Sequence, residues 1–228
     1  MWLDGIFMAS PYLVQYGATF NEPALFDEAT KQILLINSKT YDPATGLFYH
    51  GWDESREQKW SNPETGCSPN FWSRSIGWYG AAIVDVLDFL PQETAGLVKY
   101  QDPSSGTWYQ VTDQGAREGN YLESSATALF IYTLAKAINK GYIGNEYIEP
   151  TQKAFDGMVK TFTRLEEEED GSYTITNCCA VAGLGGDSKR YRDGSFEYYI
   201  SEPIIENDPK SVGSFILAAI EYEKMTKK

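Results

Sequence analysis

The chain has 228 residues, of which 42% are hydrophobic and 14% aromatic, so it is long enough to bury one good-sized core. Its formal net charge of −13 argues against nucleic acid and against anionic membrane surfaces as partners. No apolar run approaches the roughly 20 residues of a membrane span, and no basic segment at the start indicates a signal peptide. The three cysteines indicate neither a disulfide framework nor a metal site. We therefore expect a mostly reduced compartment, with a cytoplasmic location favoured and a periplasmic one left open.

An aspartate near the start lies in an otherwise apolar run from Trp2 to Ala9 (WLDGIFMA). Poor solvation in such a run favours the protonated form of a carboxyl, and a protonated carboxyl can act as a general acid. An apolar helical pattern follows Asp4, so the aspartate could instead be a helix N-cap. The local sequence leaves both roles open.

Five further helices are expected from apolar periodicity and from their end signals. Asn21 is expected to cap a helix that carries Pro23 in its first turn and runs to about Asn37. The others are expected at 71–90, stopped by Pro91, at 122–140, ended by Gly141, and at 147–165 and 210–225. The acidic run 166–170 is expected to be a solvated helix end. No long alternating pattern indicates strands.

A turn motif recurs along the chain with a spacing of about 60 residues. Its copies lie at 42–50 (DPATGLFYH), 102–110 (DPSSGTWYQ) and 170–173 (DGSY), with a closer fourth at 193–196 (DGSF). Each predicts a turn with a glycine at positive φ, followed by a short extended aromatic segment. Turns that separate helices at a regular period indicate a ring of helical hairpins.

The length of the chain does not suffice for a closed ring of this kind. Six hairpins at this period would need about 360 residues, and the chain holds fewer than four repeats. We therefore expect the sequence to be a C-terminal portion of a longer protein. The short segment 92–99 replaces a full helix of the later repeat, so it is expected to form a shortened hairpin.

Five motifs occur in a fixed order over almost the whole chain. They are WLDGIFM at 2–8, HGWD at 50–53, WSRSIGW at 72–78, GNYLESSA at 119–126 and DGSFEYYISEP at 193–203. Together they resemble glycoside hydrolase family 105, the unsaturated rhamnogalacturonyl hydrolases, and the related family 88. The resemblance implies an all-α fold, an (α/α)6 barrel of the six-hairpin glycosidase type. It also implies that residues 1–228 are a single catalytic domain, the C-terminal portion of a barrel whose first third is absent here.

The resemblance further implies a hydration reaction. Members of family 105 remove the Δ4,5-unsaturated galacturonyl residue that a lyase leaves on pectin (rhamnogalacturonan) oligosaccharides. The enol ether is hydrated, and the resulting hemiketal opens and releases the sugar. One carboxyl can first donate a proton to C4 and then act as base for the water that attacks C5. The family's catalytic aspartate matches Asp4, but its second aspartate, N-terminal to this motif, has no match, so we expect the chain alone to react poorly.

The matched motifs also imply a set of substrate-binding residues. His50, the only histidine, matches the family's sugar-binding histidine, although a lone histidine is often structural. Arg74 is implied to hydrogen-bond the sugar or its carboxylate, with Trp72 or Trp78 as a ring platform. The alternative for Arg74 is a surface arginine packed on aromatic rings. Trp2 is expected to form a wall of the pocket.

Two glutamates, Glu123 and Glu202, are expected either to line the cavity or to have capping and structural roles. Neither a cofactor nor a metal is expected, because protonating an enol ether needs no Lewis acid. The expected ligand is an unsaturated uronic-acid oligosaccharide. Self-association through the open edge of the barrel is a further expectation, because exposed apolar helix faces mark interfaces.

Three alternative functions stay open. The chain could be a non-catalytic carbohydrate-binding relative that keeps the aromatic pocket. It could also be an unsaturated glucuronyl hydrolase that acts on another uronic-acid polysaccharide. A sugar epimerase on a similar barrel is disfavoured, because such enzymes normally use a pair of histidines and this sequence has one.

Overall fold

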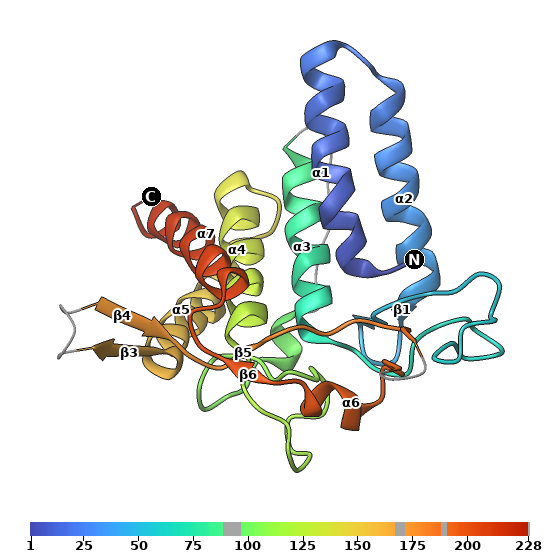
Figure 1. Cartoon of the computed structure of the whole chain (residues 1–228). Helices are drawn as coiled ribbons and strands as arrows, with labels where there is room; N and C mark the ends of the chain where they lie inside the picture. The colour runs from blue at the N-terminus through green and yellow to red at the C-terminus, as the bar shows by residue number, and fades with distance from the viewer. Residues whose placement is uncertain (89–96, 167–171, 188–190, 228) are drawn as a thin grey trace.

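The structure, a computed structural model, describes residues 1–88, 97–166, 172–187 and 191–227. Helices dominate these ranges (Figure 1), which confirms the predicted all-α fold. The helices are α1 (Leu3–Phe20), α2 (Ala24–Thr40), α3 (Ser73–Leu87), α4 (Ser124–Lys140), α5 (Ile148–Phe162), α6 (Phe196–Ser201) and α7 (Pro209–Thr226). Two 3-10 turns, η1 (Leu97–Tyr100) and η2 (Asn145–Tyr147), precede α4 and α5.

The strands are short and pair only two at a time within the described ranges. The three antiparallel pairs are β1 (Tyr41–Asp42) with β2 (Leu47–Phe48), β3 (Thr163–Glu166) with β4 (Ser172–Ile175), and β5 (Cys178–Cys179) with β6 (Ile204–Ile205). They gather at one end of the helices, together with α6 (Figure 1). The strands therefore belong to the loop layer and do not form a core sheet.

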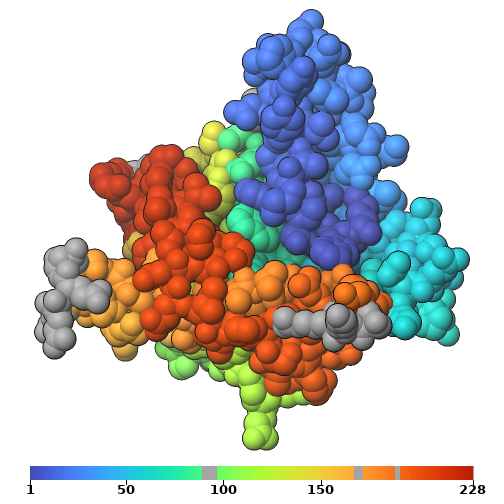
Figure 2. All heavy atoms as spheres, in the orientation of Figure 1, coloured from blue at the N-terminus to red at the C-terminus, as the bar shows by residue number. Residues whose placement is uncertain are grey.

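Four helices pack side by side in the order α1, α3, α4 and α7. Helix α2 packs against α1, and α5 packs against α4, so each of these pairs is a helical hairpin. The row is an open arc with α1 and α7 as its two end helices. In Figure 2, atoms of α3 and α4 are set back between those of α1 and α7.

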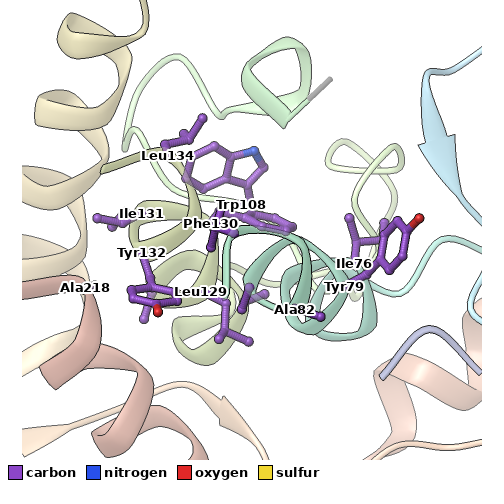
Figure 3. Packing of buried hydrophobic residues seen from close by; sticks show 14 of the residues in the cluster. Ile76, Tyr79, Ala82, Trp108, Leu129, Phe130, Ile131, Tyr132, Leu134 and Ala218 are labelled. Atoms are coloured by element: carbon purple, nitrogen blue, oxygen red, sulfur yellow. The ribbon is translucent and has the colours of Figure 1, made fainter. Parts of the chain in front are cut away.

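The core of the molecule surrounds α4, which is buried from Ser124 to Ile138. Trp108 of the second turn motif meets Phe130 edge-on, with ring centroids 5.1 Å apart (Figure 3). A Cβ atom on Gly77 of α3 would lie 2.8 Å from Cβ of Leu129, so only glycine permits this approach. The close contact of α3 with α4 thus depends on a missing side chain.

The repeated turns have the predicted conformation where the structure describes them. Gly46 and Gly106 have φ angles of 80° and 77°. The carboxylates of Asp42 and Asp102 accept hydrogen bonds from the backbone N–H groups of Thr45 and Ser105. The glycine of the third copy, at 171, lies outside the described residues.

The last residue of each of the first two turn copies, and Asn177 four residues after the third, accepts a hydrogen bond from the start of a helix. The backbone N–H of Leu3 donates to the carbonyl of His50 at 3.0 Å, and Ser73 donates to Gln110 at 3.1 Å. In the same way Ser124 donates to Asn177 at 3.0 Å. The first turns of α1, α3 and α4 are therefore tied to the loop layer, and side chains from different hairpins meet there.

The predicted cap at Asn21 is wrong. Asn21 has a φ angle of 58° and is the C-cap of α1, whereas α2 begins only at Ala24. Asparagine tolerates the left-handed conformation that ends many helices, so it can end one helix here as readily as it could cap the start of the next. The helix that follows extends to Thr40, three residues beyond the prediction.

The helix predicted at 147–165 is wrong at its C-terminal end. Helix α5 stops at Phe162, and the residues that follow form β3, which pairs with β4. Cross-strand pairing prevails over the helical pattern at these positions. Glu166 is accordingly the last residue of a strand and not part of a helix end, while 167–170 lie outside the described residues.

The remaining helix predictions hold apart from their ends. Helix α4 ends at Gly141, whose φ angle is 73°, and α7 covers the predicted range. Helix α3 spans Ser73–Leu87, so it begins two residues later and ends three residues earlier than the predicted range of 71–90. Most of the segment expected to be a shortened hairpin, 92–96, lies outside the described residues. No described helix is long and apolar enough to cross a membrane.

Candidate active site

Asp4 lies in the first turn of α1 and faces His50. Its Oδ1 atom is 3.6 Å from Nε2 of His50, just beyond hydrogen-bond length. Both atoms are buried, and neither has a hydrogen-bond partner in the part of the chain that the structure describes. The imidazole is fully buried, whereas the Asp4 side chain keeps 22% of its surface exposed. The structure thus brings together the two residues that the motifs implied at the sugar site, and the acidic side chain still reaches solvent.

The alternative role of Asp4 as a helix cap is wrong. Trp2 occupies the N-cap position of α1 with an extended backbone, and no side chain caps this end. The helix is anchored instead by the bond from the N–H of Leu3 to the carbonyl of His50. This bond joins the residue before Asp4 to the residue that Asp4 faces, so it holds the pair together.

Three aromatic rings enclose the imidazole of His50. The ring centroids of Trp2, Trp72 and Tyr199 lie 5.6, 4.7 and 6.0 Å from it. Trp72 and Tyr199 are themselves stacked, with an interplanar angle of 13°. Trp2 and Trp72, both expected at the sugar site, therefore lie beside His50.

Arg74 forms a second buried polar centre, which also contacts the ring of Trp72. Its guanidinium carbon is 5.0 Å from the centre of the Trp72 ring, and the side chain is 1% exposed. Nη1 donates to the carbonyl oxygen of Cys179 at 2.6 Å and to Oγ of Ser125 at 3.3 Å. Arg74 is thus a buried cation that holds β5, and the alternative of a surface arginine is wrong. Its contact with a sugar stays a prediction.

Glu123 has a capping role. One carboxylate oxygen accepts a hydrogen bond from the backbone N–H of Ala126 at 2.6 Å, which makes Glu123 the N-cap of α4. The other accepts the N–H of Cys179 at 2.9 Å, and the hydroxyl of Ser125 donates to both. Glu202, at the C-cap of α6, is 2% exposed.

Trp78 lies one turn after Arg74 on α3, and its ring centroid is 4.5 Å from that of Phe7 on α1. Phe7 in turn follows Asp4 by one helical turn. Trp78 is therefore part of the contact between the two helices that begin at the site. Its role as a sugar platform stays a prediction.

Burial sets the charge states of the enclosed groups. Desolvation lowers the pKa of His50, with Asp4 as the main opposing influence, so the imidazole is neutral at neutral pH. Burial also raises the pKa of Tyr199 well above its ordinary value, so its hydroxyl keeps its proton. For Arg74, burial alone would lower the pKa, but the carboxylate of Glu123 and its neighbours raise it overall.

Two residues of this network were not singled out from the sequence. The hydroxyl of Tyr199 lies 2.6 Å from Nδ1 of His50. Gln110 accepts a hydrogen bond from Nε1 of Trp72 and donates one to the backbone carbonyl of Tyr199, both at 3.3 Å. A signal for Gln110 was available, because it ends the second turn motif as His50 ends the first. Tyr199 lies within the motif at 193–203, but nothing in that motif indicates its partner.

The cysteines and the possible metal ligands were compared with the site described above. Cys67, Cys178 and Cys179 are buried and free. Over the described ranges, no three histidine, cysteine, aspartate or glutamate side chains are grouped so that they could hold a metal ion.

Comparison with solved structures defines the class of protein. A family 105 glycoside hydrolase from C. acetobutylicum ATCC 824 matches with a TM-score of 0.92 and 41% identity, over 98% of this chain and 65% of that one. A possible family 105 member from Salmonella enterica matches with a TM-score of 0.78 and 28% identity, over 100% of this chain and 57% of that one. These matches identify the arc of hairpins as part of a six-hairpin glycosidase fold. The chain thus spans less than two thirds of these solved relatives.

Sequence comparison specifies the family. The model of Glycosyl Hydrolase Family 88 matches residues 1–226. The chain therefore belongs to this family, and it is also similar to the family 105 structures named above.

Two curated relatives differ in length. The 24.9 kDa protein in the picA locus of Rhizobium radiobacter is 38% identical over an alignment of 229 residues. The alignment covers 94% of this chain and 97% of the relative. The unsaturated rhamnogalacturonyl hydrolase YesR of Bacillus subtilis (strain 168) is 23% identical over 190 residues, which cover 77% of this chain and 51% of the relative. The sequence therefore matches both a relative of its own size and part of a longer one.

Proposed function

We propose that this protein removes a Δ4,5-unsaturated uronyl residue from lyase-generated oligosaccharides, with Asp4 as general acid and base and residues 1–228 as one catalytic domain. The observation that carries the proposal is the Asp4–His50 pair, in a chain that belongs to a glycoside hydrolase family. Both facing atoms are buried and lack a hydrogen-bond partner among the described residues. Buried polar groups are normally satisfied, and exceptions call for an explanation. A bound substrate that completes these bonds is such an explanation.

The proposed reaction needs one carboxyl in two successive states. Protonated Asp4 donates its proton to C4 of the enol ether, and positive charge develops at C5 and the ring oxygen. The resulting Asp4 carboxylate then takes a proton from the water that attacks C5, which restores the acid. The hemiketal opens and releases the sugar at the reducing side. The partial exposure of the Asp4 side chain gives substrate and water access to it.

The surroundings of Asp4 suit a uronic acid. The ring of Trp2, which is partly exposed, provides a flat apolar surface of the kind that sugars stack on. Trp72 is 2% exposed and stacked on Tyr199, so it supports the site from behind and is not an open platform. Arg74 contributes a positive charge behind Trp72, which complements the carboxylate of a uronate. We infer that the finer substrate is a rhamnogalacturonan fragment, as the name of the relative YesR suggests.

The test is a hydration assay on the purified chain. We expect the ultraviolet absorbance of the unsaturated bond to fall when the chain meets an unsaturated galacturonyl–rhamnose disaccharide. A slow rate is expected, because no residue matches the family's second aspartate, so a high protein concentration is required. A matched unsaturated glucuronyl disaccharide tests the alternative substrate. Binding by calorimetry without any loss of absorbance would favour the carbohydrate-binding alternative.

We also propose that the end helices of the arc mediate self-association. Met8, Tyr12, Tyr16 and Phe20 recur every four residues along α1 and are 63%, 64%, 39% and 61% exposed. On α7, Ile216, Leu217 and Ile220 are 53%, 38% and 46% exposed. Apolar surface in water costs about 25 cal/mol per Å², so a second copy that covers these faces would stabilise the fold.

Light scattering after size-exclusion chromatography tests this proposal. We expect a dimer or larger species for the native chain, and a shift toward monomer for a Tyr12→Ser, Phe20→Ser double variant. A stable monomer with a cooperative thermal transition would show the proposal to be wrong.

A further inference from the structure

His50 has two ring nitrogens with different partners. Nδ1 lies 2.6 Å from the hydroxyl of Tyr199, and Nε2 lies 3.6 Å from Oδ1 of Asp4. Because the buried imidazole is neutral, only one of the two nitrogens carries a proton. Which nitrogen carries it decides whether His50 presents a donor or a lone pair toward Asp4.

The partners of the two nitrogens select one tautomer. When Asp4 is in its carboxylate form its oxygens only accept hydrogen bonds, so a lone pair on Nε2 would face another lone pair on Asp4. A tyrosine hydroxyl can donate, and Tyr199 has no other described acceptor near its oxygen than Nδ1. Donation from Tyr199 to Nδ1 leaves the ring proton on Nε2, where it points at the acceptor. Both partners therefore favour the Nε2–H form.

The position of Tyr199 is fixed by the fold and not by His50 alone. Tyr199 is fully buried in α6, and its backbone N–H donates to the carbonyl of Ser195 at 3.1 Å. Its own carbonyl accepts the hydrogen bond from Gln110, which also holds Trp72. The Trp72 ring is stacked on that of Tyr199. The hydroxyl is thus pre-positioned at Nδ1.

We propose that Tyr199 is a positioning residue that donates its hydroxyl proton to Nδ1 of His50 and so keeps the imidazole proton on Nε2, directed at Asp4. In that arrangement His50 supplies one N–H donor for the Asp4 carboxylate after it has given up its proton, or for a sugar hydroxyl beside it. The tautomer is inferred from the contacts of His50 with Tyr199 and with the carboxylate form of Asp4, while its catalytic consequence rests on the proposed function.

Nitrogen NMR tests the tautomer directly, because His50 is the only histidine of the chain. With ¹⁵N-labelled histidine, long-range proton–nitrogen spectra report a single imidazole without ambiguity. At neutral pH we expect a neutral ring protonated on Nε2, with an Nδ1 resonance typical of a hydrogen-bonded acceptor. A proton on Nδ1 in the native chain would overturn the proposal, even if no variant folds.

The variant Tyr199→Phe removes only the hydroxyl. We expect the Nδ1 resonance to move toward that of a nitrogen without a hydrogen bond, and the Nδ1–H form to gain population. An unchanged His50 spectrum in this variant would also overturn the proposal. The control is Tyr79→Phe, which removes a hydroxyl from another buried tyrosine, 3.4 Å from the carbonyl of Ile33, and should leave the His50 spectrum unchanged.

Kinetics separate the positioning role from a purely structural one. In the hydration assay, Tyr199→Phe should lower kcat about 10-fold, the effect of one lost hydrogen bond, with little change in KM. Tyr79→Phe should keep both constants. If the native chain shows the expected tautomer but no hydration, the proposed function fails and the assignment of Tyr199 to the His50 tautomer stands.

Discussion

Two buried polar centres share Trp72 as a neighbour, and they differ in how their hydrogen-bonding capacity is used. Around Arg74 and Glu123, backbone and side-chain groups of α4 and β5 meet the charged atoms at hydrogen-bond distance. Between Asp4 and His50, the two facing atoms are 3.6 Å apart and have no hydrogen-bond partner in the described ranges.

The difference in hydrogen bonding indicates that the two centres have different roles, one in stability and one in ligand binding. A buried charge that is hydrogen-bonded to groups of several elements stabilises one arrangement of the chain. A buried donor and acceptor left unbonded cost stability in the free protein and are found where a ligand completes them. We therefore propose that the Arg74 centre mainly stabilises the fold, while its charge can still attract a uronate from behind Trp72, and that the Asp4 centre carries the chemistry.

The largest expected effect is on stability, for Arg74→Met. The substitution removes the cation while the Glu123 carboxylate stays buried, which typically costs about 3–5 kcal/mol. Urea denaturation monitored by tryptophan fluorescence measures the free energy of unfolding. The matched control is Arg117→Met, because Arg117 pairs with Glu197 at the surface and should contribute no more than about 1 kcal/mol. Equal losses for the two variants would contradict the assignment.

The opposite pattern is expected for Asp4→Asn. The amide can neither donate a proton to carbon nor act as a base, so turnover should fall by about 10²-fold or more. The free energy of unfolding should stay within about 1 kcal/mol of the native value, because Oδ1 makes no hydrogen bond that the change would break. Near-normal turnover would show that Asp4 is not the catalytic carboxyl.

The smallest expected effect is a pH dependence of stability that comes from His50. Burial lowers its pKa in the folded chain, so the unfolded chain binds this proton first as the pH falls. The contribution of neutral His50 to the free energy of unfolding is fully present above about pH 6.5. Below that pH it decreases, by at most about 1.4 kcal/mol per pH unit for one proton. Asp4, Arg74 and Tyr199 are the other charged or titratable groups that face the ring.

The variant His50→Gln isolates this contribution from the carboxylates, which titrate at lower pH. Between about pH 5 and 7, its unfolding free energy should vary less with pH than that of the native chain. If the unfolding free energies of the variant and the native chain changed equally with pH, the buried imidazole would take up its proton as easily as in the unfolded chain.

Local sequence patterns were sufficient to predict where most of the helices lie, and together with the motifs they indicated that Asp4 lies near His50. Periodic apolar residues define α4 and α7, and the repeated turns place the ends of hairpins in one layer. The motif resemblance then indicated which of the side chains in that layer belong together.

The partners of these side chains could not be predicted in the same way. Tyr199 meets His50 across 149 residues, and Arg74 meets Cys179 across 105. Such pairs depend on how the loop layer packs, which no local pattern encodes. The β3–β4 hairpin was missed for a similar reason, since cross-strand pairing determines the conformation after Phe162.

The central claim is that Asp4 protonates C4 of an unsaturated uronide, and the most direct test is to run the hydration in deuterated water. Proton and carbon NMR of the product should show one deuterium at the former C4 position with the native chain, and no product above background with Asp4→Asn. Release of the sugar with the double bond intact would mean an ordinary glycosidic displacement. That result, or a deuterated product formed equally well by Asp4→Asn, would contradict the account.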